Sequence, residues 1–167
     1  MSAAAPSALT PVAARRIQSE LRDFTRNPPD GCRLETFEPI TTWIIHMDGP
    51  EATPGMPNLY EGEKFRLQVK FTERYPLEPP EVVFVPPHTP AHPHVYSNGH
   101  ICLDILYDGQ NGGWSPALTI NKVCLSLRSM LASNTEKARP PGDADYCSRV
   151  GMRSPKYTRW VFEDDRV

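Results

Sequence analysis

The sequence predicts a single α+β domain, in which an antiparallel meander of short strands packs with two helices. Three observations predict this class. Apolar residues recur at helical spacing over residues 13–24 and again over 120–131, the stretch between them contains strand-like segments, and no helical pattern separates those segments. Strands that follow one another without an intervening helix pair antiparallel. A chain of 167 residues is long enough for one domain with its own core.

The first helix is predicted from apolar residues spaced by three or four, namely Ala13, Ile17, Leu21 and Phe24. Pro28 and Pro29 cannot continue a helix and mark its end. The other face of this helix is polar and carries Arg15, Arg16, Glu20, Arg22 and Asp23. Residues 1–11 are rich in Ala, Ser and Pro but lack the basic and apolar regions of a signal peptide, so we expect a flexible leader.

Three segments have the composition of strands. Residues 40–47 are β-branched and aromatic, residues 65–71 alternate strictly between apolar and polar, and residues 81–85 form a short apolar run. Seven prolines then fall between Pro76 and Pro93. Because proline has no N–H to donate, we expect this stretch to be an extended surface segment rather than a central strand or helix.

The second helix follows a glycine-rich loop, and Thr119 is its predicted N-cap. Its apolar face is formed by Ile120, Val123, Cys124, Leu127, Met130 and Leu131. The core domain is therefore assigned to residues 12–139. Residues 140–167 contain proline, glycine and charged residues as well as several aromatic ones. We expect this C-terminal segment to be irregular and mobile.

Composition excludes little but gives no sign of nucleic-acid or membrane binding. A net charge of −2 and a pI near 6.2 offer no attraction for phosphate or anionic lipid. The sequence has no apolar run near the length of about 20 residues needed to span a bilayer. The four cysteines include no C-x-x-C pair, which favours reduced thiols in the cytoplasm or the nucleus.

The sequence H-P-H-V-Y-S-N-G-H-I-C-L, residues 92–103, places three of the five histidines within ten residues of Cys102. These are zinc-type ligands, but their intervals match no familiar zinc site, so no metal is predicted. A Cys–His hydrolase is also weakly supported, because the local signatures of cysteine proteases are absent. A third interpretation is that Cys102 carries an acyl group as a thioester. This chemistry needs an exposed thiol and oxyanion donors, and no strong base that would activate water.

A structural role for Cys102 must also be considered, since free cysteines are among the most often buried residues. Alternation along an extended segment would place Ile101 and Leu103 on one side and Cys102 on the other.

The order of motifs resembles that of ubiquitin-conjugating enzymes. An N-terminal helix is followed by P-P, Y-x-G-x-x-F, F-T-E-R-Y-P-L-E-P-P, H-P-x-V-Y-S-N-G-x-I-C-L-D-I-L and W-S-P-A-L, which together cover roughly residues 12–135. The resemblance implies the UBC fold, a four-stranded antiparallel meander sheet with an N-terminal and a central helix packed on it. It implies an acyltransferase that passes ubiquitin from a thioester to an amine, with no cofactor.

The resemblance also implies roles for individual positions. Cys102 would accept the C-terminal carboxyl group of ubiquitin, Asp104 fits the family pattern two residues later, and Asn98 is a weaker catalytic candidate. The ligase-binding surface would comprise Arg15, Arg16, Pro76, Leu77, Ser115, Pro116 and Ala117. Most members have a larger aromatic residue where Leu77 stands, so the identity of the ligase stays open.

Two departures from the family pattern concern the acceptor. Most members have H-P-N, whereas His94 makes this motif H-P-H. By ungapped counting, the acid that often flanks the cysteine falls on Ala138, with Glu136 or Asp143 as alternative acids. These features and the R-P-P sequence that follows make the chain most similar to the W-type branch of the family, which is associated with transfer to N-terminal α-amines.

Amine chemistry points to the same acceptor. Near pH 7.4 a lysine amine with a pKa of about 10.4 is roughly 0.1% neutral, whereas an α-amine near 7.8 is roughly a quarter neutral. A site without the usual acid is therefore expected to lose most of its activity toward lysine and little of its activity toward an α-amine. His94 has two interpretations that stay open: it accepts a proton, because imidazole titrates near neutrality, or its N–H supports the loop or the oxyanion.

The expected partners are ubiquitin, a ubiquitin-activating enzyme, RING or U-box ligases, and substrates with flexible N-termini. Two alternatives from other classes remain at this point. The chain could be a non-catalytic scaffold with the same fold, although such a protein would be expected to lack the cysteine. It could also carry another ubiquitin-like modifier.

Overall fold

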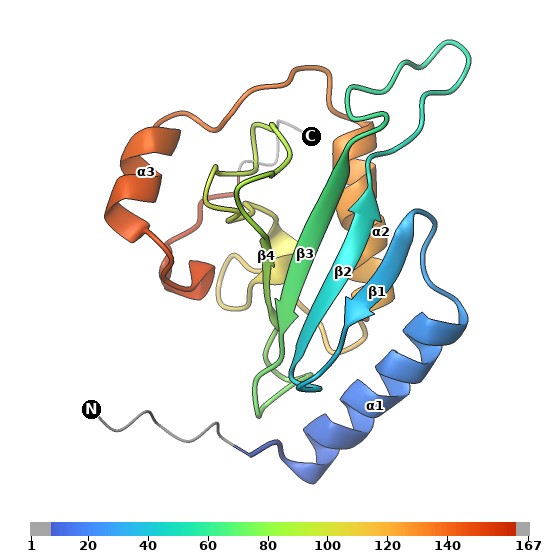
Figure 1. Cartoon of the computed structure of the whole chain (residues 1–167). Helices are drawn as coiled ribbons and strands as arrows, with labels where there is room; N and C mark the ends of the chain where they lie inside the picture. Colours follow the sequence, from blue (N-terminus) through green and yellow to red (C-terminus); the bar gives the residue numbers. More distant parts are fainter. Residues whose placement is uncertain (1–7, 163–167) are drawn as a thin grey trace.

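In the computed structural model, which describes residues 8–162, four antiparallel strands form an open sheet with helices on one side and at one end (Figure 1). The strands are adjacent in sequence order, as expected for a meander. They are β1 (Cys32–Thr36), β2 (Thr42–Asp48), β3 (Lys64–Lys70) and β4 (Glu81–Phe84). The predicted fold is confirmed. β4 lies at an edge of the sheet, and this placement suits the proline-rich sequence around it.

Helix α1 (Pro11–Arg26) begins at a capped end. The Thr10 hydroxyl accepts a hydrogen bond from the Ala13 N–H, and Pro11 occupies the first turn, where no N–H is needed. Helix α2 (Ile120–Ala132) begins in the same way, since Thr119 accepts from the Lys122 N–H. The predicted N-cap of α2 is thus confirmed. Most of the predicted leader lies outside the described residues.

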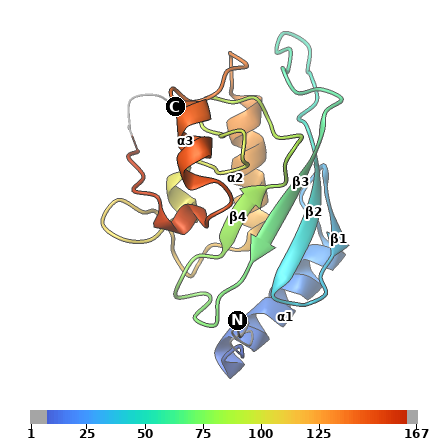
Figure 2. The same ribbon diagram turned by 60° about the vertical axis from the view of Figure 1, so that its left-hand side comes forward.

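The core lies between the sheet and α2, which covers one face of it (Figure 2). Alternate residues of β2 and β3 point into this layer and are fully or almost fully buried. Helix α2 contributes its predicted apolar stripe, including Cys124, which is completely buried. The buried side chains are Trp43, Ile45, Met47, Phe65, Leu67, Val69, Ile120, Val123, Cys124, Leu127 and Leu131.

Glu20 is the exception among the charged residues on the polar face of α1. Its side chain is buried, and its carboxylate accepts hydrogen bonds from the Tyr75 hydroxyl and the Ile120 N–H. Arg16 also donates to it. A buried carboxylate is tolerated when several donors satisfy it, and here the donors include the N-terminal end of α2. Periodicity within α1 does not reveal these partners, which lie 55 and 100 residues away.

The described part of the C-terminal segment is largely irregular, as expected, but contains one helix that was not predicted. Helix α3 (Asp143–Val150) is followed by the 3-10 turn η2 (Pro155–Tyr157). Another 3-10 turn, η1 (Asp104–Leu106), follows the candidate cysteine. The sequence of α3 is short, and Tyr146 is its one buried residue, so it carries little helical periodicity.

Within the described residues, the structure has no helix that is both long enough and apolar enough to cross a membrane.

Candidate active site

Cys102 lies at the surface end of a short bridge between two loop segments. Ile101, which pairs with Val95, is completely buried, whereas Cys102 is half-buried. The Cys102 N–H donates to the carbonyl oxygen of His94 over 2.8 Å. Cys102 is therefore not a core residue, and its backbone is held against the H-P-H turn.

The S-N-G turn before Cys102 depends on glycine. Gly99 has a φ of +92°, and a Cβ atom there would lie 1.9 Å from the Phe84 carbonyl oxygen. The Phe84 N–H donates to the Gly99 carbonyl in return, which fixes the turn against β4. Only a residue without a side chain permits this approach, so Gly99 sets where the turn delivers the cysteine.

The surroundings of Cys102 keep its thiol protonated. Burial raises its pKa to about 11, and the nearby charge of Asp104 adds to the effect. Within the described part of the chain, the hydrogen-bond partner of Sγ is the Val161 carbonyl oxygen, at 4.0 Å, and not a histidine. This arrangement lacks the activating base of a Cys–His hydrolase and suits a thiol that holds an acyl group.

His94 lies beside the cysteine backbone. Its Nδ1 is 3.1 Å from the Cys102 carbonyl oxygen, which can only accept, so Nδ1 carries the proton. In the neutral ring this leaves the lone pair on Nε2. The His94 N–H donates to Nδ1 of His92 over 2.9 Å. Both interpretations of His94 stay compatible with this geometry, because the bond that supports the loop also leaves Nε2 able to accept a proton.

His92 has a different role from His94. It is buried, and its Nε2 donates to the Met130 carbonyl at the end of α2. Burial, and then the proximity of His94, lowers the pKa of His92 to about 4. A ring that stays neutral at physiological pH fastens the H-P-H turn to the central helix.

Asn98 and Asp104, the other predicted catalytic residues, lie on either side of the cysteine. The Asn98 side chain accepts from the His100 N–H and donates to the Gly151 carbonyl, so it links the turn to the C-terminal segment. Asp104 is exposed and accepts from the Ile105 N–H at the start of η1.

The C-terminal segment packs against this turn, a contact that was not predicted from the sequence. The Asp143 carboxylate accepts hydrogen bonds from the N–H and the hydroxyl of Ser97. Asp143 was one of the two alternatives for the missing acid, and both of its carboxylate oxygens are bound to Ser97. Nδ1 of buried His100 lies 2.7 Å from the Tyr146 hydroxyl, and burial lowers the His100 pKa. Tyr96 also packs against Tyr146, with ring centroids 4.0 Å apart and the rings tilted by 32°. In the sequence, the aromatic residues of the C-terminal segment were the one indication that it packs against the rest of the domain.

The predicted ligase-binding residues gather on a single surface. Arg16 donates to the Pro116 and Leu118 carbonyls, each over 2.8 Å, and so ties α1 to the W-S-P-A-L loop. The Trp114 indole donates to the Pro76 carbonyl over 2.9 Å and joins that loop to the Y-P-L turn. Leu77 itself is 68% exposed. Also exposed on this surface are Arg15, Pro116 and Ala117, while Ser115 is half-buried.

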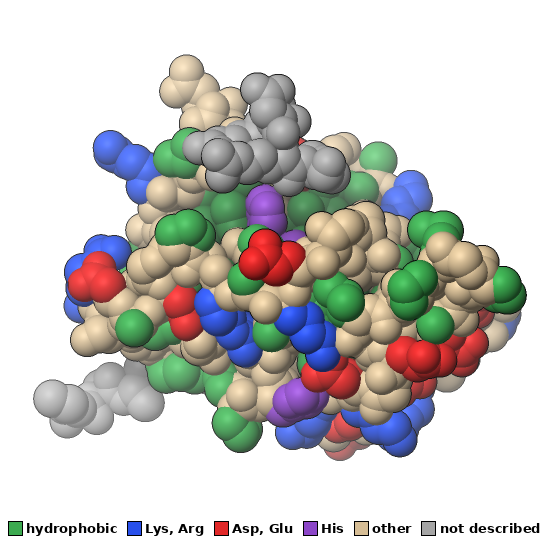
Figure 3. Space-filling model, turned by 90° about the horizontal axis from the view of Figure 1, so that it is seen from above, with side chains coloured by type: hydrophobic (Ala, Val, Ile, Leu, Met, Phe, Trp, Pro, Cys, Tyr) green, Lys and Arg blue, Asp and Glu red, His purple; other side chains and the backbone are tan. Residues whose placement is uncertain are grey.

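The surface charge is mixed. Seen from above, acidic, basic and hydrophobic side chains are interspersed (Figure 3). Among the described residues, no three His, Cys, Asp or Glu side chains lie close enough together to hold a metal ion.

Comparison with known proteins shows the family to which this chain belongs. A family model described as ubiquitin-conjugating enzyme matches residues 16–163. A probable ubiquitin-conjugating enzyme E2 W from Dictyostelium discoideum is 50% identical over 154 residues, covering 92% of this chain and 97% of the relative. Ubiquitin-conjugating enzyme 15 from Arabidopsis thaliana is 48% identical and covers 99% of both chains. The crystal structure of the ubiquitin-conjugating enzyme UbcA1 from Agrocybe aegerita, 38% identical, covers 87% of this chain and 99% of that one, with a TM-score of 0.75.

The chain therefore belongs to the ubiquitin-conjugating enzyme family, as its motifs predicted. It is similar to W-type members over most of its length, including a Danio rerio protein named E2 W-A at 46% identity. Enzymes of this family transfer ubiquitin through a thioester intermediate, and their partners are ubiquitin, an activating enzyme and ligases.

Proposed function

We propose that this ubiquitin-conjugating enzyme carries ubiquitin on Cys102 and transfers it preferentially to the α-amines of protein N-termini. The observation that supports Cys102 as the ubiquitin acceptor is how its surroundings differ from those of the other three cysteines. Cys32 and Cys124 are buried in the core, and Cys147 is bound to Asp143 on α3. Cys102 is half-buried at the end of a fixed turn, without a histidine bonded to its sulfur.

The transfer step needs little from the protein beyond position. The neutral amine attacks the thioester carbonyl, a C–N bond forms, and the C–S bond breaks. The sulfur leaves as thiolate and takes up a proton, while the amine nitrogen loses one. Since the pKa of Cys102 is raised to about 11, the released thiol is protonated at neutral pH.

The preference for α-amines is supported by the surroundings of the thioester position. By ungapped counting, Ala138 falls at the place of the usual acid, and Arg139 beside it donates to the carbonyls of Thr89, Pro90 and Val95. An α-amine, already partly neutral at physiological pH, needs no carboxylate to deprotonate it, unlike a lysine. Nε2 of His94 would accept the proton while the Nδ1 bond holds the ring.

The thioester is tested by incubating the protein with ubiquitin, activating enzyme and Mg-ATP. We expect the unchanged protein to form an adduct with ubiquitin that reductant cleaves. The Cys102→Ser variant should form either a reductant-resistant oxyester or no adduct. Cys147→Ser is the matched control and should charge normally. An adduct linked elsewhere would contradict the assignment, absence of any adduct would favour a scaffold, and charging only with another modifier would identify a different carrier.

The acceptor preference is tested with His94→Asn, which restores the residue of most family members. Thioester formation should be unchanged, because an amide can also donate to the Cys102 carbonyl. Discharge to the side chain of lysine should rise relative to discharge to an α-amine, in single-turnover measurements with small amines. If the ratio of the two rates does not change, His94 does not select the acceptor.

We also propose the types of ligase and substrate with which the enzyme works and the cellular compartment in which it acts. The exposed surface around Leu77 would receive RING or U-box ligases, and substrates would offer flexible N-termini. All four cysteines are free, which suits the reducing cytoplasm or nucleus.

A further inference from the structure

The side chain of Tyr107 reaches back to the backbone that precedes Cys102. The chain reverses at the 3-10 turn η1, where the Tyr107 N–H donates to the Asp104 carbonyl over 3.0 Å. The Tyr107 side chain is buried, and its hydroxyl donates to the Ile101 carbonyl over 2.6 Å. Within the described residues, the Ile101 carbonyl accepts from no other group. Because a buried carbonyl without a donor is costly, this one depends on Tyr107.

The two peptide groups that meet at Cys102 are each held by hydrogen bonds. In the group before it, the Ile101 carbonyl accepts from Tyr107 at one edge. At the opposite edge, the Cys102 N–H donates to the His94 carbonyl over 2.8 Å. The group after it is held through the Cys102 carbonyl oxygen, which is 3.1 Å from Nδ1 of His94. Because a peptide group is planar and includes both flanking Cα atoms, these bonds fix the Cα of Cys102 and leave its side chain to rotate about the Cα–Cβ bond.

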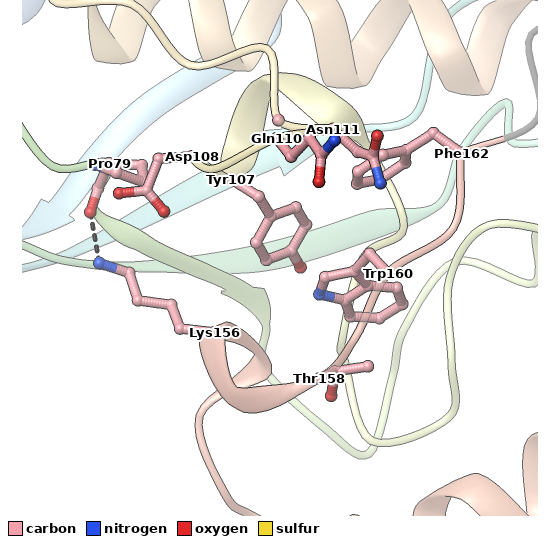
Figure 4. Close-up of a pocket in the computed structure, with 10 residues that line it drawn as sticks. Pro79, Tyr107, Asp108, Gln110, Asn111, Lys156, Thr158, Trp160 and Phe162 are labelled. Atoms are coloured by element: carbon pink, nitrogen blue, oxygen red, sulfur yellow. Dashed lines mark hydrogen bonds between the residues drawn. The ribbon is translucent and has the colours of Figure 1, made fainter.

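The ring of Tyr107 packs against the C-terminal segment, where it lines a pocket together with Trp160 and Phe162 (Figure 4). Its centroid lies 5.2 Å from that of Trp160 and 6.1 Å from that of Phe162. Burial raises the pKa of Tyr107, so the hydroxyl keeps its proton over the physiological pH range. That single proton is engaged by the Ile101 carbonyl and is not free for an oxyanion or an amine. Tyr107 therefore acts on the reaction through the cysteine backbone and not through contact with the substrate.

We propose that Tyr107 is a positioning residue: its hydroxyl, by holding the Ile101 carbonyl, orients Cys102 so that the thioester carbonyl faces the incoming amine. The proposal rests on the proposed function in taking Cys102 as the ubiquitin acceptor, but it does not depend on which amine attacks. Tyr107 keeps its proton throughout, so no step is added to the transfer. The effect on the rate arises because misplacing a reacting atom by about 1 Å can slow a reaction about a hundredfold.

The test compares Tyr107→Phe, which removes only the hydroxyl, with Tyr60→Phe as the matched control. The Tyr60 hydroxyl also donates over 2.6 Å to a backbone carbonyl, that of Ala91, which is outside the peptide groups that flank Cys102. Both variants leave one backbone carbonyl without this donor, so their melting temperatures should fall by similar amounts.

Each ubiquitin-charged protein is discharged in a single turnover to alaninamide and, separately, to Nα-acetyl-lysine amide. Tyr107→Phe should charge to the same extent as the unchanged protein and discharge about tenfold more slowly to both amines, because the thioester and not the acceptor is displaced. Tyr60→Phe should discharge at the unchanged rate. Hydrogen exchange of the Cys102 N–H should be about tenfold faster in Tyr107→Phe than in Tyr60→Phe, since this amide reports local opening of the loosened peptide group.

Equal discharge rates in Tyr107→Phe and the unchanged protein would overturn the proposal. So would an equal slowing in the two variants, which would show a structural effect, or a slowing with one amine only, which would assign Tyr107 to acceptor selection. Should Tyr107→Phe not fold, 4-fluorophenylalanine at position 107 fills the space of the hydroxyl without donating, and the same rates decide. A failure of the proposed function is seen separately, because the unchanged protein would then form no reductant-sensitive adduct on Cys102.

Discussion

At the residue scale, the same side-chain types acquire different chemistry from their neighbours. His92 and His94 are two positions apart, yet His92 is buried and bonded to α2, whereas His94 is half-buried and bonded to the Cys102 carbonyl. The Cys102 thiol, with its raised pKa, is unreactive until a partner removes its proton. A protonated thiol suits an acyl carrier, because a thiolate that does not yet hold ubiquitin would be alkylated or oxidised.

Asp104→Asn should lower the pKa of Cys102, because it removes a nearby negative charge that disfavours the thiolate. The rate of iodoacetamide alkylation at Cys102 should then rise a few-fold at pH 8.5. The increase should be partial, since burial is the larger cause of the shift. Mass spectrometry of the Cys102 peptide reports the rate, and Asp23→Asn, an exposed change on α1, serves as control. An unchanged pH profile would mean that Asp104 does not act on the sulfur electrostatically.

At the element scale, the protein joins its loops through buried polar groups. Glu20 links α1 to Tyr75 in the Y-P-L turn and to Ile120 at the start of α2. On the other side of the molecule, Ser97, Asn98 and His100 hold the C-terminal segment to the turn before the cysteine. The proposed ligase surface and the candidate active site are thus each assembled from segments far apart in sequence.

His92 should make the domain sensitive to acid, because it fastens the H-P-H turn to α2 in its neutral form. Its pKa is about 4 in the folded protein and about 6.5 in the unfolded chain, so the unfolded chain binds the proton first as the pH falls. The stability that His92 contributes is therefore lost between pH 6.5 and 4, amounting to about 3 kcal/mol at pH 4.

Urea unfolding at pH 7.5 and at pH 4 measures this loss. His92→Gln should lower stability at pH 7.5 by about 1–3 kcal/mol, because buried partners lose their bonds. It should also decrease the difference between the two pH values. A residual slope from His100, whose pKa is lowered by burial, should persist in the variant. An equal pH dependence in both proteins would exclude His92 as its source.

At the scale of the whole molecule, patterns that repeat along the chain were predictable from the sequence, whereas contacts between distant segments were not. Both main helices, three of the four strands and the Thr119 cap follow from local spacing. β1 was found only through the family resemblance, because it is a short edge strand whose residues mix exposed and buried positions. Helix α3 was missed because a single buried tyrosine gives no periodicity.

For the candidate site, the sequence identified Cys102 and the H-P-H motif, since the motif lies on one continuous stretch. Which nitrogen of His94 carries the proton, and that Asp143 is bound to Ser97, depend on partners that spacing does not specify.

The sequence by itself determined the family, the meander sheet with its two main helices, and the cysteine to be tested, because these depend on local patterns and ordered motifs. The tertiary structure alone decided the burial of Glu20, the raised pKa of Cys102 and the packing of the C-terminal segment on the active-site turn. Burial and hydrogen bonding across tens of residues are properties of the packed chain, and no local pattern encodes them.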